Sequence, residues 1–545
     1  MRERSLLFAM LFAGIATVAS AQSVSSPDGF PIDNPTVKAR CGSCHRSDDK
    51  GRMSRISFRR ATPENWERTI KRMVALNHAT LSPEDARAIL KYLADHQGLA
   101  PEELRPIAFE PERRMIDYEY KGDEMTSNLC TSCHSISRVL SERRTKEEWQ
   151  LLLAMHRGYY PLVDNQPMNG PQGFRRTRPI QTEPGPDGRP PDNRQPMDRA
   201  LEHLEKTLPL TTAEWSAWSA AMQPPKLAGK WAISGSQTGK GPIYGVMTIA
   251  ADGNTPDAFT TDIRYTVART GETVTHTGKA VIYTGYQWRG RANDWREVMF
   301  VERDWKEMWG RWFSGAYDET GIDVKLSRLA SEPTVFGASV TAIKTGSAAQ
   351  NVRIFGANLP SSIRAEDIGL GQGVKVSRIV NARADEVSID VDVAASAPVG
   401  VRDISLAGTV KPNIFVVYDK VDAIKVLPQA GMARVGGNVF PKQLQQFEAI
   451  GVSHGLDIGL VDVKWSLEEY TATFTDDDVQ YVGTLDQTGL FTPNVDGPNP
   501  KRSGNRNNVG DVWVVAELKD HPVRARAHLL VTVPLYMNWF TEDQK

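Results

Sequence analysis

The sequence predicts a multidomain protein of mixed class, in which a helical N-terminal part precedes an all-β remainder. The chain has 545 residues, and at roughly 150 residues per domain this corresponds to three or four domains. Apolar residues recur at helical spacing up to about residue 226 and alternate with polar residues after it. The 65 Lys and Arg against 66 Asp and Glu leave a net charge of −1. This balance gives no basic excess for a nucleic-acid or anionic-membrane partner.

The first 21 residues have the pattern of a cleavable export signal. Basic residues precede an apolar run over residues 6–18, and Ala19-Ser20-Ala21 supplies small residues for cleavage before Gln22. The run is shorter than the ~20 residues that cross a bilayer. No later segment is longer and as apolar, so no membrane span is expected. We therefore expect residues 1–21 to be a signal peptide and the mature chain to be exported to the periplasm.

All four cysteines lie in two C-x-x-C-H motifs, at residues 41–45 and 130–134. This spacing is the signature of c-type haem attachment. Two thiols so spaced reach the two vinyl groups of one porphyrin, and the adjacent histidine is the proximal iron ligand. A thioredoxin-like site needs no such histidine, and a zinc site normally takes its ligands from closer positions. The sequence therefore predicts two covalent c-haems on Cys41, Cys44, Cys130 and Cys133, with His45 and His134 as proximal ligands.

A helix pattern that recurs after each motif suggests the distal iron ligands. The segments at residues 62–66 and 145–149 both begin with a threonine suited to an N-cap and end in tryptophan. Counted from each tryptophan, Met73 and His156 occupy the same place, so we name them as distal ligands. Core packing of Met73 and a merely buried or exposed His156 stay open. Other candidates are Met53, His78, His96, Met155, Met168 and Met197. Because a His/Met haem normally has a higher potential than a bis-His haem, the two haems are expected to differ in potential.

The paired signals predict an internal duplication. Each unit closes with a second helix start, for which Ser82 and Thr211 are the expected N-caps, with Asp85 and Glu214 at the third helical position. We expect one dihaem cytochrome c domain over residues 22–226, built from tandem units at about 22–107 and 108–226. An insert at residues 161–199, rich in Pro, Gly, Asn and Arg, is expected to run as a surface loop.

Residues 227–332 are predicted to form an antiparallel β-barrel. Short aromatic or β-branched segments bounded by Gly, Asn or Asp recur there. The opening Gly229-Lys230-Trp231 resembles the Gly-x-Trp start of lipocalin-like barrels. The expected strands are residues 244–249, 259–265, 281–286, 296–301, 308–317 and 322–326. Five tryptophans are assigned to wall and core packing rather than to a pocket, namely Trp288, Trp295, Trp305, Trp309 and Trp312.

Residues 333–418 and 419–545 are predicted as two immunoglobulin-like β-sandwiches without disulfides. None of the three β modules shows a nucleophile–base pair, a phosphate loop or clustered metal ligands in its sequence, so no catalytic residue is assigned. The expected strands are residues 352–355, 373–379, 386–391 and 403–406 in the first module, and 447–453, 461–465, 511–518 and 525–533 in the second.

Two tandem haem units followed by three β modules resemble the α subunit of bacterial quinohaemoprotein amine dehydrogenase. The resemblance covers the whole mature chain and rests on domain order, both haem motifs, the tryptophan helix after each, and residues 148–161. It implies a heterotrimer that deaminates primary amines oxidatively to aldehyde and ammonia. In that family the amine reacts at a cysteine tryptophylquinone on a small γ subunit, and a β subunit of propeller fold holds the assembly. This chain would pass electrons from the quinone through its two haems to a soluble cupredoxin or cytochrome c.

Two other function classes stay open at this point. A free-standing dihaem electron carrier, whose β modules bind a surface, would purify as a stable monomer. A dihaem peroxidase-like enzyme would need an open or displaceable sixth position at one iron and a nearby acid–base group. The oxidised spectrum of such an enzyme would contain a high-spin component.

Overall fold

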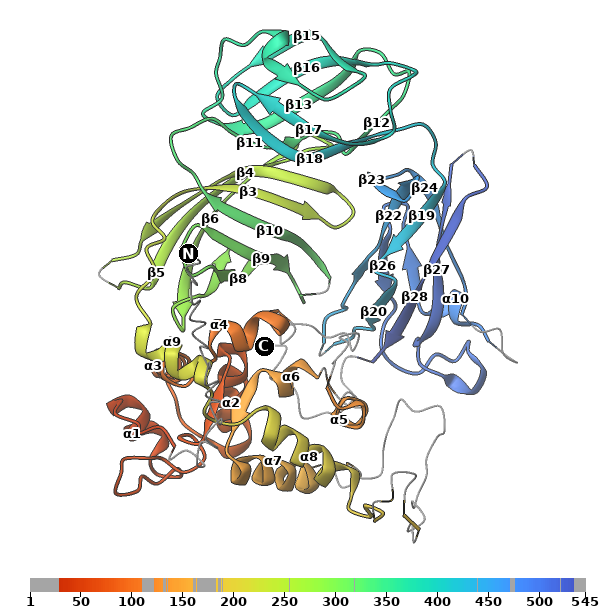
Figure 1. Ribbon diagram of the computed structural model, residues 1–545. Coiled ribbons are helices and arrows are strands. Elements are labelled where there is room, and N and C mark those ends of the chain that lie inside the picture. Colours follow the sequence, from red (N-terminus) through yellow and green to blue (C-terminus); the bar gives the residue numbers. More distant parts are fainter. Residues whose placement is uncertain are drawn as a thin grey trace, which may run out of the picture.

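The computed structural model describes residues 29–109, 122–130, 134, 136–159, 163, 183–184, 188, 190–253, 255–317, 319–438, 440–470, 476–519 and 521–533. In Figure 1 the helices lie at the base, a β-barrel stands above them, and two further β units lie above and beside the barrel. The expected signal peptide and most of the 161–199 insert lie outside the described residues. Within the described part of the chain, every helix is too short or too polar to span a lipid bilayer.

Two helix pairs form the helical part. Helix α2 (Pro63–Asn77) contacts α3 (Pro83–His96), and α7 (Lys146–Tyr159) contacts α8 (Pro196–Thr207). The N-cap predictions are confirmed for three of these helices, because the side chain of the capping residue accepts a backbone N–H from three residues on. The confirmed caps are Thr62, Ser82 and Thr145. The shorter helices are α1 (Pro35–Cys41), α4 (Pro101–Leu104), α5 (Glu124–Cys130), α6 (Ser137–Leu140) and α9 (Ala213–Ala221).

Two details of the predicted helix pattern are wrong. The N-cap of α9 is Thr212 rather than Thr211, because the hydroxyl of Thr212 accepts the backbone N–H of Trp215 at 3.2 Å. The helix that pairs with α7 is α8, not α9, and it begins at Pro196 inside the stretch expected to be a loop. Proline is favoured at the first helical position, where its missing N–H costs no hydrogen bond. The last residues of the stretch that was expected to be a loop therefore belong to a helix.

Eight antiparallel strands close into the barrel, which confirms that part of the predicted fold. Two predicted segments run too far, because Gly285 and Gly315 adopt positive φ and turn the chain there. Trp231 of the predicted opening motif is fully buried in the barrel. The strands are β3 (Gly229–Gln237), β4 (Gly241–Ala251), β5 (Ala258–Val267), β6 (Thr273–Tyr283), β7 (Gln287–Ala292), β8 (Trp295–Val301), β9 (Glu307–Ser314) and β10 (Thr320–Arg328).

The barrel shares its core with the helical part. Leu104, Ile107 and Trp149 belong to the same buried cluster as the barrel interior. Tyr286, in the turn before β7, donates its hydroxyl to the carbonyl of Leu99 at 2.9 Å. The five tryptophans all lie in or against this cluster, as predicted. One end of the barrel therefore rests on the helices as a continuous packed unit.

Two four-stranded sheets enclose a common core after the barrel. Among its most buried residues are Ile354, Ile389 and Val417. One sheet contains β11 (Thr334–Ala338), β13 (Gln350–Ala357), β16 (Glu386–Val393) and β15 (Val374–Ala382). The other contains β12 (Ala342–Lys344), β18 (Thr409–Tyr418), β17 (Gly400–Leu406) and β14 (Ile368–Gly369). The sequence prediction missed four strands of this module. Strands β11 and β18 lie at its two ends, and β12 and β14 are very short.

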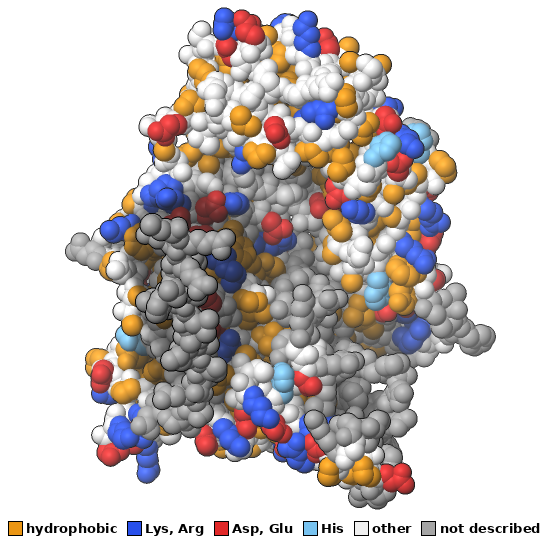
Figure 2. Space-filling model, viewed as in Figure 1, with side chains coloured by type: hydrophobic (Ala, Val, Ile, Leu, Met, Phe, Trp, Pro, Cys, Tyr) orange, Lys and Arg blue, Asp and Glu red, His pale blue; other side chains and the backbone are white. Residues whose placement is uncertain are grey.

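The last module has one four-stranded and two three-stranded sheets about a core that includes Phe447, Trp465 and Phe491. The larger sheet contains β20 (Ala430–Arg434), β28 (Arg524–Thr532), β27 (Gly510–Leu518) and β24 (Val463–Glu469). The smaller sheets contain β19 (Ala423–Leu427), β22 (Glu448–Ser453) and β23 (Leu456–Leu460), and β21 (Gln445–Gln446), β26 (Leu490–Pro493) and β25 (Gly483–Leu485). On the face shown in Figure 2, acidic and basic side chains are interspersed over this module and its neighbour.

Candidate haem-binding sites

A short antiparallel bridge joins the two helix pairs. Strand β1 (Arg59–Ala61) precedes α2, strand β2 (Glu142–Arg144) precedes α7, and the two strands pair with Arg60 opposite Arg143. Arg60 and Arg143 also stand at the same distance before the N-cap threonines of their helices, Thr62 being two residues after Arg60 and Thr145 two after Arg143. Equivalent residues thus face each other in register. An approximate twofold axis therefore passes through the bridge.

The buried tryptophans repeat the same relation on both sides of the axis. Trp66 donates its indole N–H to the carbonyl of Gln97, at the end of α3, at 3.1 Å. Trp149 donates to the carbonyl of Leu208, at the end of α8, at 3.3 Å. Each tryptophan therefore fixes the second helix of its own unit. The unit is a helix pair, and the repeat is structural as well as sequential.

The first motif begins at the last residue of a helix. Cys41 ends α1, and neither Cys41 nor Cys44 forms a disulfide. Burial and the neighbouring Cys44 raise the pKa of the Cys41 thiol. Nδ1 of His45 lies 2.9 Å from the carbonyl oxygen of Ser54. If Nδ1 carries the proton, it donates to this carbonyl, the ring is held in one orientation, and Nε2 is left as the ligand atom. This arrangement is typical of metal-binding histidines.

The second motif has the same local start. Helix α5 ends at Cys130, and Asp123 before the helix accepts both the backbone N–H and the hydroxyl of Thr126 at 2.7 Å. Cys130 and His134 are half-buried, and Cys130 packs against the core shared with the barrel. Cys133 lies outside the described residues. Its part in haem attachment therefore stays a prediction.

Met73 lies half-buried on α2, two turns after Trp66. Ile70, one turn before it, packs against the same hydrophobic cluster as Cys41. Helix α2 therefore packs against the same hydrophobic cluster as the first motif. The position fits a distal ligand, although a methionine at this spacing fits core packing equally well.

The surroundings of His156 on α7 favour one protonation state and one tautomer of its ring. Burial lowers the pKa of its imidazole and favours the neutral ring. Its Nδ1 lies 2.8 Å from the carbonyl oxygen of Leu152, so a proton on Nδ1 places the lone pair on Nε2. Leu152 and Cys130 pack against the same core. The tautomer and the location both fit an iron ligand.

The rival distal ligands differ in burial. Met53 is fully buried in the cluster against which Cys41 packs, so it stays a candidate. His78 and His96 are exposed; His78 ends α2 with φ of 56°, and His96 stacks on the ring of Tyr92. Met155 and Met197 are half-buried, and Met168 lies outside the described residues.

Buried charge fills the twofold interface. Arg60 is fully buried and makes a two-pronged ion pair with Glu103, at 2.8 Å for both contacts. Arg143 reaches the same carboxylate at 3.3 Å. Burial alone would raise the pKa of Glu103, but the hydrogen bonds and charges of the two arginines lower it to about 2. Glu103 is therefore ionised and neutralises two like charges that face each other.

Glu142 is held in the same way. It lies 2.6 Å from Arg59 and 2.6 Å from Arg144. Burial would raise the pKa of Glu142, but the two guanidinium groups lower it to about 2. The charges of Arg144 and Arg72 lower the pKa of His156, and that of Glu142 raises it. The bridge is therefore within electrostatic range of the expected distal ligand of the second unit.

Sequence reasoning missed this network. The signal was present as an arginine pair shortly before each N-cap threonine, Arg59-Arg60 in the first unit and Arg143-Arg144 in the second. Charged side chains are almost always exposed unless they are paired. Apart from the pair of Arg144 with Glu142, the partners come from distant segments, and only the folded chain brings these together.

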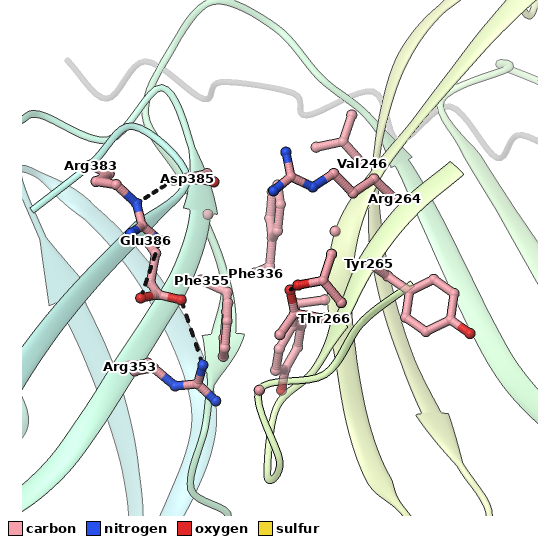
Figure 3. A pocket seen from close by; sticks show the side chains of 15 residues that line it. Val246, Arg264, Tyr265, Thr266, Phe336, Arg353, Phe355, Arg383, Asp385 and Glu386 are labelled. Carbon is pink, nitrogen blue, oxygen red and sulfur yellow. Dashed lines mark hydrogen bonds and ion pairs between the residues drawn. The ribbon is translucent and has the colours of Figure 1, made fainter. Parts of the chain in front are cut away.

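A separate cleft of about 360 Å³ lies between the barrel and the first sandwich (Figure 3). Arg383 pairs with Asp385 at 3.3 Å and with Glu386 at 3.4 Å, and Arg353 lies 3.9 Å from Glu386. The lining residues, all within the described part of the chain, include no cysteine, histidine or serine. The cleft therefore offers no nucleophile–base pair, and the donors suited to a cofactor lie at the two motifs.

Four protein-family models match the chain in order. "Quinohemoprotein amine dehydrogenase A, alpha subunit, haem binding" matches residues 33–173. The models of alpha subunit domains II, III and IV match residues 224–329, 332–419 and 424–542. The chain belongs to the quinohaemoprotein amine dehydrogenase α subunit family. It is thus a haem-binding subunit of an oxidoreductase, and the family predicted from the sequence is confirmed.

No protein of curated function matches the α subunit chain. Solved structures resemble parts of it. A de novo designed fluorescence-activating β-barrel is 15% identical, with 19% of this chain and 93% of that chain covered and a TM-score of 0.15. A mouse clustered protocadherin fragment is 14% identical, with 42% and 76% covered and a TM-score of 0.17. Tandem Ig repeats of Dlar are 12% identical, with 37% and 100% covered and a TM-score of 0.13.

Proposed function

We propose that this α subunit carries two covalent c-haems and transfers electrons within a periplasmic amine dehydrogenase. One observation supports it most: two C-x-x-C-H motifs belong to two helical units related by an approximate twofold axis. Cys41, Cys44, Cys130 and Cys133 would form the thioethers. His45 and His134 would be the proximal ligands, and Met73 and His156 the distal ligands.

The residues of each unit position and insulate such a group. A haem supplies one-electron oxidation and reduction at its iron. His45 is oriented by its contact with the carbonyl of Ser54. The buried side chains of Trp66 and Trp149 exclude water from the helix pairs. Glu142 and its arginines set the local charge at the bridge. Because an amine oxidation releases two electrons and each iron accepts one, two such sites let the electrons leave singly.

Membership of the family supports a proposal for the source and the destination of the electrons. We infer that a cysteine tryptophylquinone on a small γ subunit oxidises the amine, and that a β-propeller subunit completes the complex. All four cysteines of this chain lie in the haem motifs, so none remains for that quinone. The acceptor would be a soluble cupredoxin or cytochrome c.

The chain would divide accordingly. We propose a signal peptide at residues 1–21, a dihaem domain at 22–226 with units at about 22–107 and 108–226, and a barrel domain at 227–332. Two immunoglobulin-like domains, which serve as docking scaffold, would follow at residues 333–418 and 419–545. The signal peptide would deliver the chain to the periplasm.

Gentle purification from the native host tests this function. We expect the haem chain to co-elute with two partners, one of them a small chain with a covalently modified tryptophan. A primary amine added to the complex should reduce the haems. A haem-loaded chain that elutes alone and is not reduced by amines would instead be a free electron carrier.

A further inference from the structure

The turn that faces His45 has an unusual backbone. The carbonyl oxygen of Ser54, which lies 2.9 Å from Nδ1 of His45, also accepts the backbone N–H of Ile56 at 2.8 Å. Arg55, between Ser54 and Ile56, has φ of 69°, a conformation that residues with a side chain rarely adopt. A hydrogen bond that spans one residue of positive φ defines a γ-turn of the rare, strained kind. Such a turn persists only where surrounding contacts hold it.

The side chain of Arg55 is tied to the other helical unit. Its Nε donates to Oε2 of Glu148, on α7, at 2.8 Å. The side chain of Arg55 is 41% exposed, whereas that of Glu148 is 5% exposed. Burial raises the pKa of Glu148, and the charge of Arg55 is the first of the influences that lower it. The backbone N–H of Glu148 donates to the hydroxyl of Thr145 at 3.2 Å, so the N-cap of α7 fixes the residue that holds Arg55.

The contact recurs on the other side of the approximate twofold axis with different chemistry. Counted from the buried tryptophans, Arg55 corresponds to Arg138, and Glu148 corresponds to Asn65. The amide of Asn65 donates to the backbone carbonyl of Arg138 at 3.1 Å. Arg138 lies in helix α6 and has ordinary helical geometry. The first unit thus combines a strained turn with an ion pair across the interface, where the second uses a helix and a neutral hydrogen bond.

We propose that Arg55 is a positioning residue for the first haem site. Its ion pair with Glu148 holds the γ-turn, and the turn presents its carbonyl to Nδ1 of His45. A hydrogen bond to the far nitrogen of a ligating imidazole raises the basicity of the ligand. A more basic ligand stabilises the oxidised iron, so the contact lowers the potential of the haem held there. The start of α7, which belongs to the second unit, thereby sets the potential of the first. The inference rests on the proposed function, because it takes His45 as an iron ligand.

A purely electrostatic role for Arg55 predicts the opposite sign. A positive charge stabilises the reduced state of an iron centre, because reduction makes the centre less positive. If Arg55 acted through its charge alone, its removal would therefore lower the potential. If it acts by holding the turn, its removal weakens the hydrogen bond to His45 and raises the potential. The sign of the change thus separates the two roles.

Potentiometric titration of the haem-loaded full chain measures this sign. Arg55→Met should shift the reduction equilibrium of one haem by about tenfold toward the reduced state, which is about 59 mV upward. Glu148→Gln should shift the same haem in the same direction, because it breaks the same ion pair, and Arg55→Lys should restore most of the original value. Arg55→Gly is the matched control: it removes the same charge and ion pair, but glycine adopts positive φ without steric cost. The turn should persist in this variant, so its potential should move less than that of Arg55→Met.

Hydrogen exchange followed by mass spectrometry gives a readout that does not depend on iron. The backbone N–H of Ile56 closes the γ-turn, so its exchange reports whether the turn is held. We expect exchange at Ile56 to be about tenfold faster in Arg55→Met than in the wild type. Arg55→Gly should exchange more slowly than Arg55→Met.

A lowered or unchanged potential in Arg55→Met would overturn the proposal, and so would equal shifts in Arg55→Met and Arg55→Gly. Unchanged exchange at Ile56 would overturn it as well, because the turn would then hold without the ion pair. Failure of the proposed function gives a different result. A purified chain whose intact mass includes no haem on the first motif contradicts the haem assignment, whereas a haem-loaded chain with an unchanged potential in Arg55→Met contradicts the positioning role alone.

Discussion

The two units of the helical part share one frame but differ where their equivalent residues meet. Counted from the buried tryptophans, Arg59 corresponds to Glu142, and these opposite charges pair with each other at 2.6 Å. Arg60 corresponds to Arg143, and these like charges face each other and share the carboxylate of Glu103. Like groups on a twofold axis repel. The comparison teaches that equivalent buried charged residues of a duplicated unit can face each other in two cases only. Either one copy carries the opposite charge, or a third group neutralises both.

The units also differ at the position proposed to ligate iron. One carries Met73 and the other His156, at the same place on α2 and α7. Only His156 has tautomers, and its own helix selects one of them, because Nδ1 lies 2.8 Å from the carbonyl oxygen of Leu152. If both residues bind iron, the repeated frame holds two centres of unlike potential.

The largest expected effect comes from the shared carboxylate. Arg60→Met removes the two-pronged ion pair with Glu103 and leaves the buried carbonyls of Leu210 and Gly98 without their donor, which should lower the free energy of unfolding by about 3–5 kcal/mol. Arg87→Met is the control, since its ion pair with Glu84 is largely exposed and should contribute less than about 1 kcal/mol. Denaturant unfolding of the helical part, followed by haem absorbance, measures both. Equal losses would mean that the interface charges do not hold the units together.

Acid should weaken the same interface. The pKa values of Glu103 and Glu142 are about 2 in the folded chain, below the value of 4.5 for a free side chain. Groups with lowered pKa stabilise the fold above the unfolded value and lose that contribution as pH falls through 4.5 toward 2, about 3 kcal/mol for each carboxylate. Unfolding measured between pH 5.5 and pH 2.5 should show this slope, and Glu103→Gln should reduce it. A slope unchanged by Glu103→Gln would show that other groups cause the acid sensitivity.

Removal of a distal ligand should affect one unit only. Met73→Ala should change the spectrum and potential of one haem, and His156→Ala those of the other. Low-temperature absorption and potentiometric titration resolve the two centres. If Met73→Ala leaves both haems unchanged, buried Met53 becomes the candidate, and the symmetry between α2 and α7 does not extend to ligation.

The smallest expected effect is electrostatic tuning by the bridge. Glu142→Gln removes a negative charge near His156 and should raise the potential of that haem by on the order of 1 kcal/mol of electron affinity. Arg144→Gln should lower it. Opposite signs identify a charge effect, whereas a loosened site would shift both variants in the same direction. Glu103→Gln is the control, because the charges that act most on the pKa of His156 are those of Arg144, Arg72 and Glu142.

The sequence was sufficient for features that depend on local pattern. Thr62, Ser82 and Thr145 are N-caps because their side chains meet nearby backbone N–H groups, a local requirement. Strand alternation predicted the barrel, although β7 was missed because Arg289, Gly290 and Arg291 break the apolar alternation of its sequence. The partners of Arg60 could not be predicted, because they depend on which distant side chains the fold brings into contact. Helix α8 was missed since its insert-like composition hides a helix start at Pro196.

Intact mass of the denatured mature chain tests the dihaem assignment most directly. Covalent haem survives denaturation, whereas haem held only by ligands is lost. A mass equal to residues 22–545 plus two haems is predicted. The Cys41→Ser/Cys44→Ser variant should lose one haem, and the Cys130→Ser/Cys133→Ser variant should lose the other. A mass that corresponds to one haem or none would contradict two c-haems on this chain.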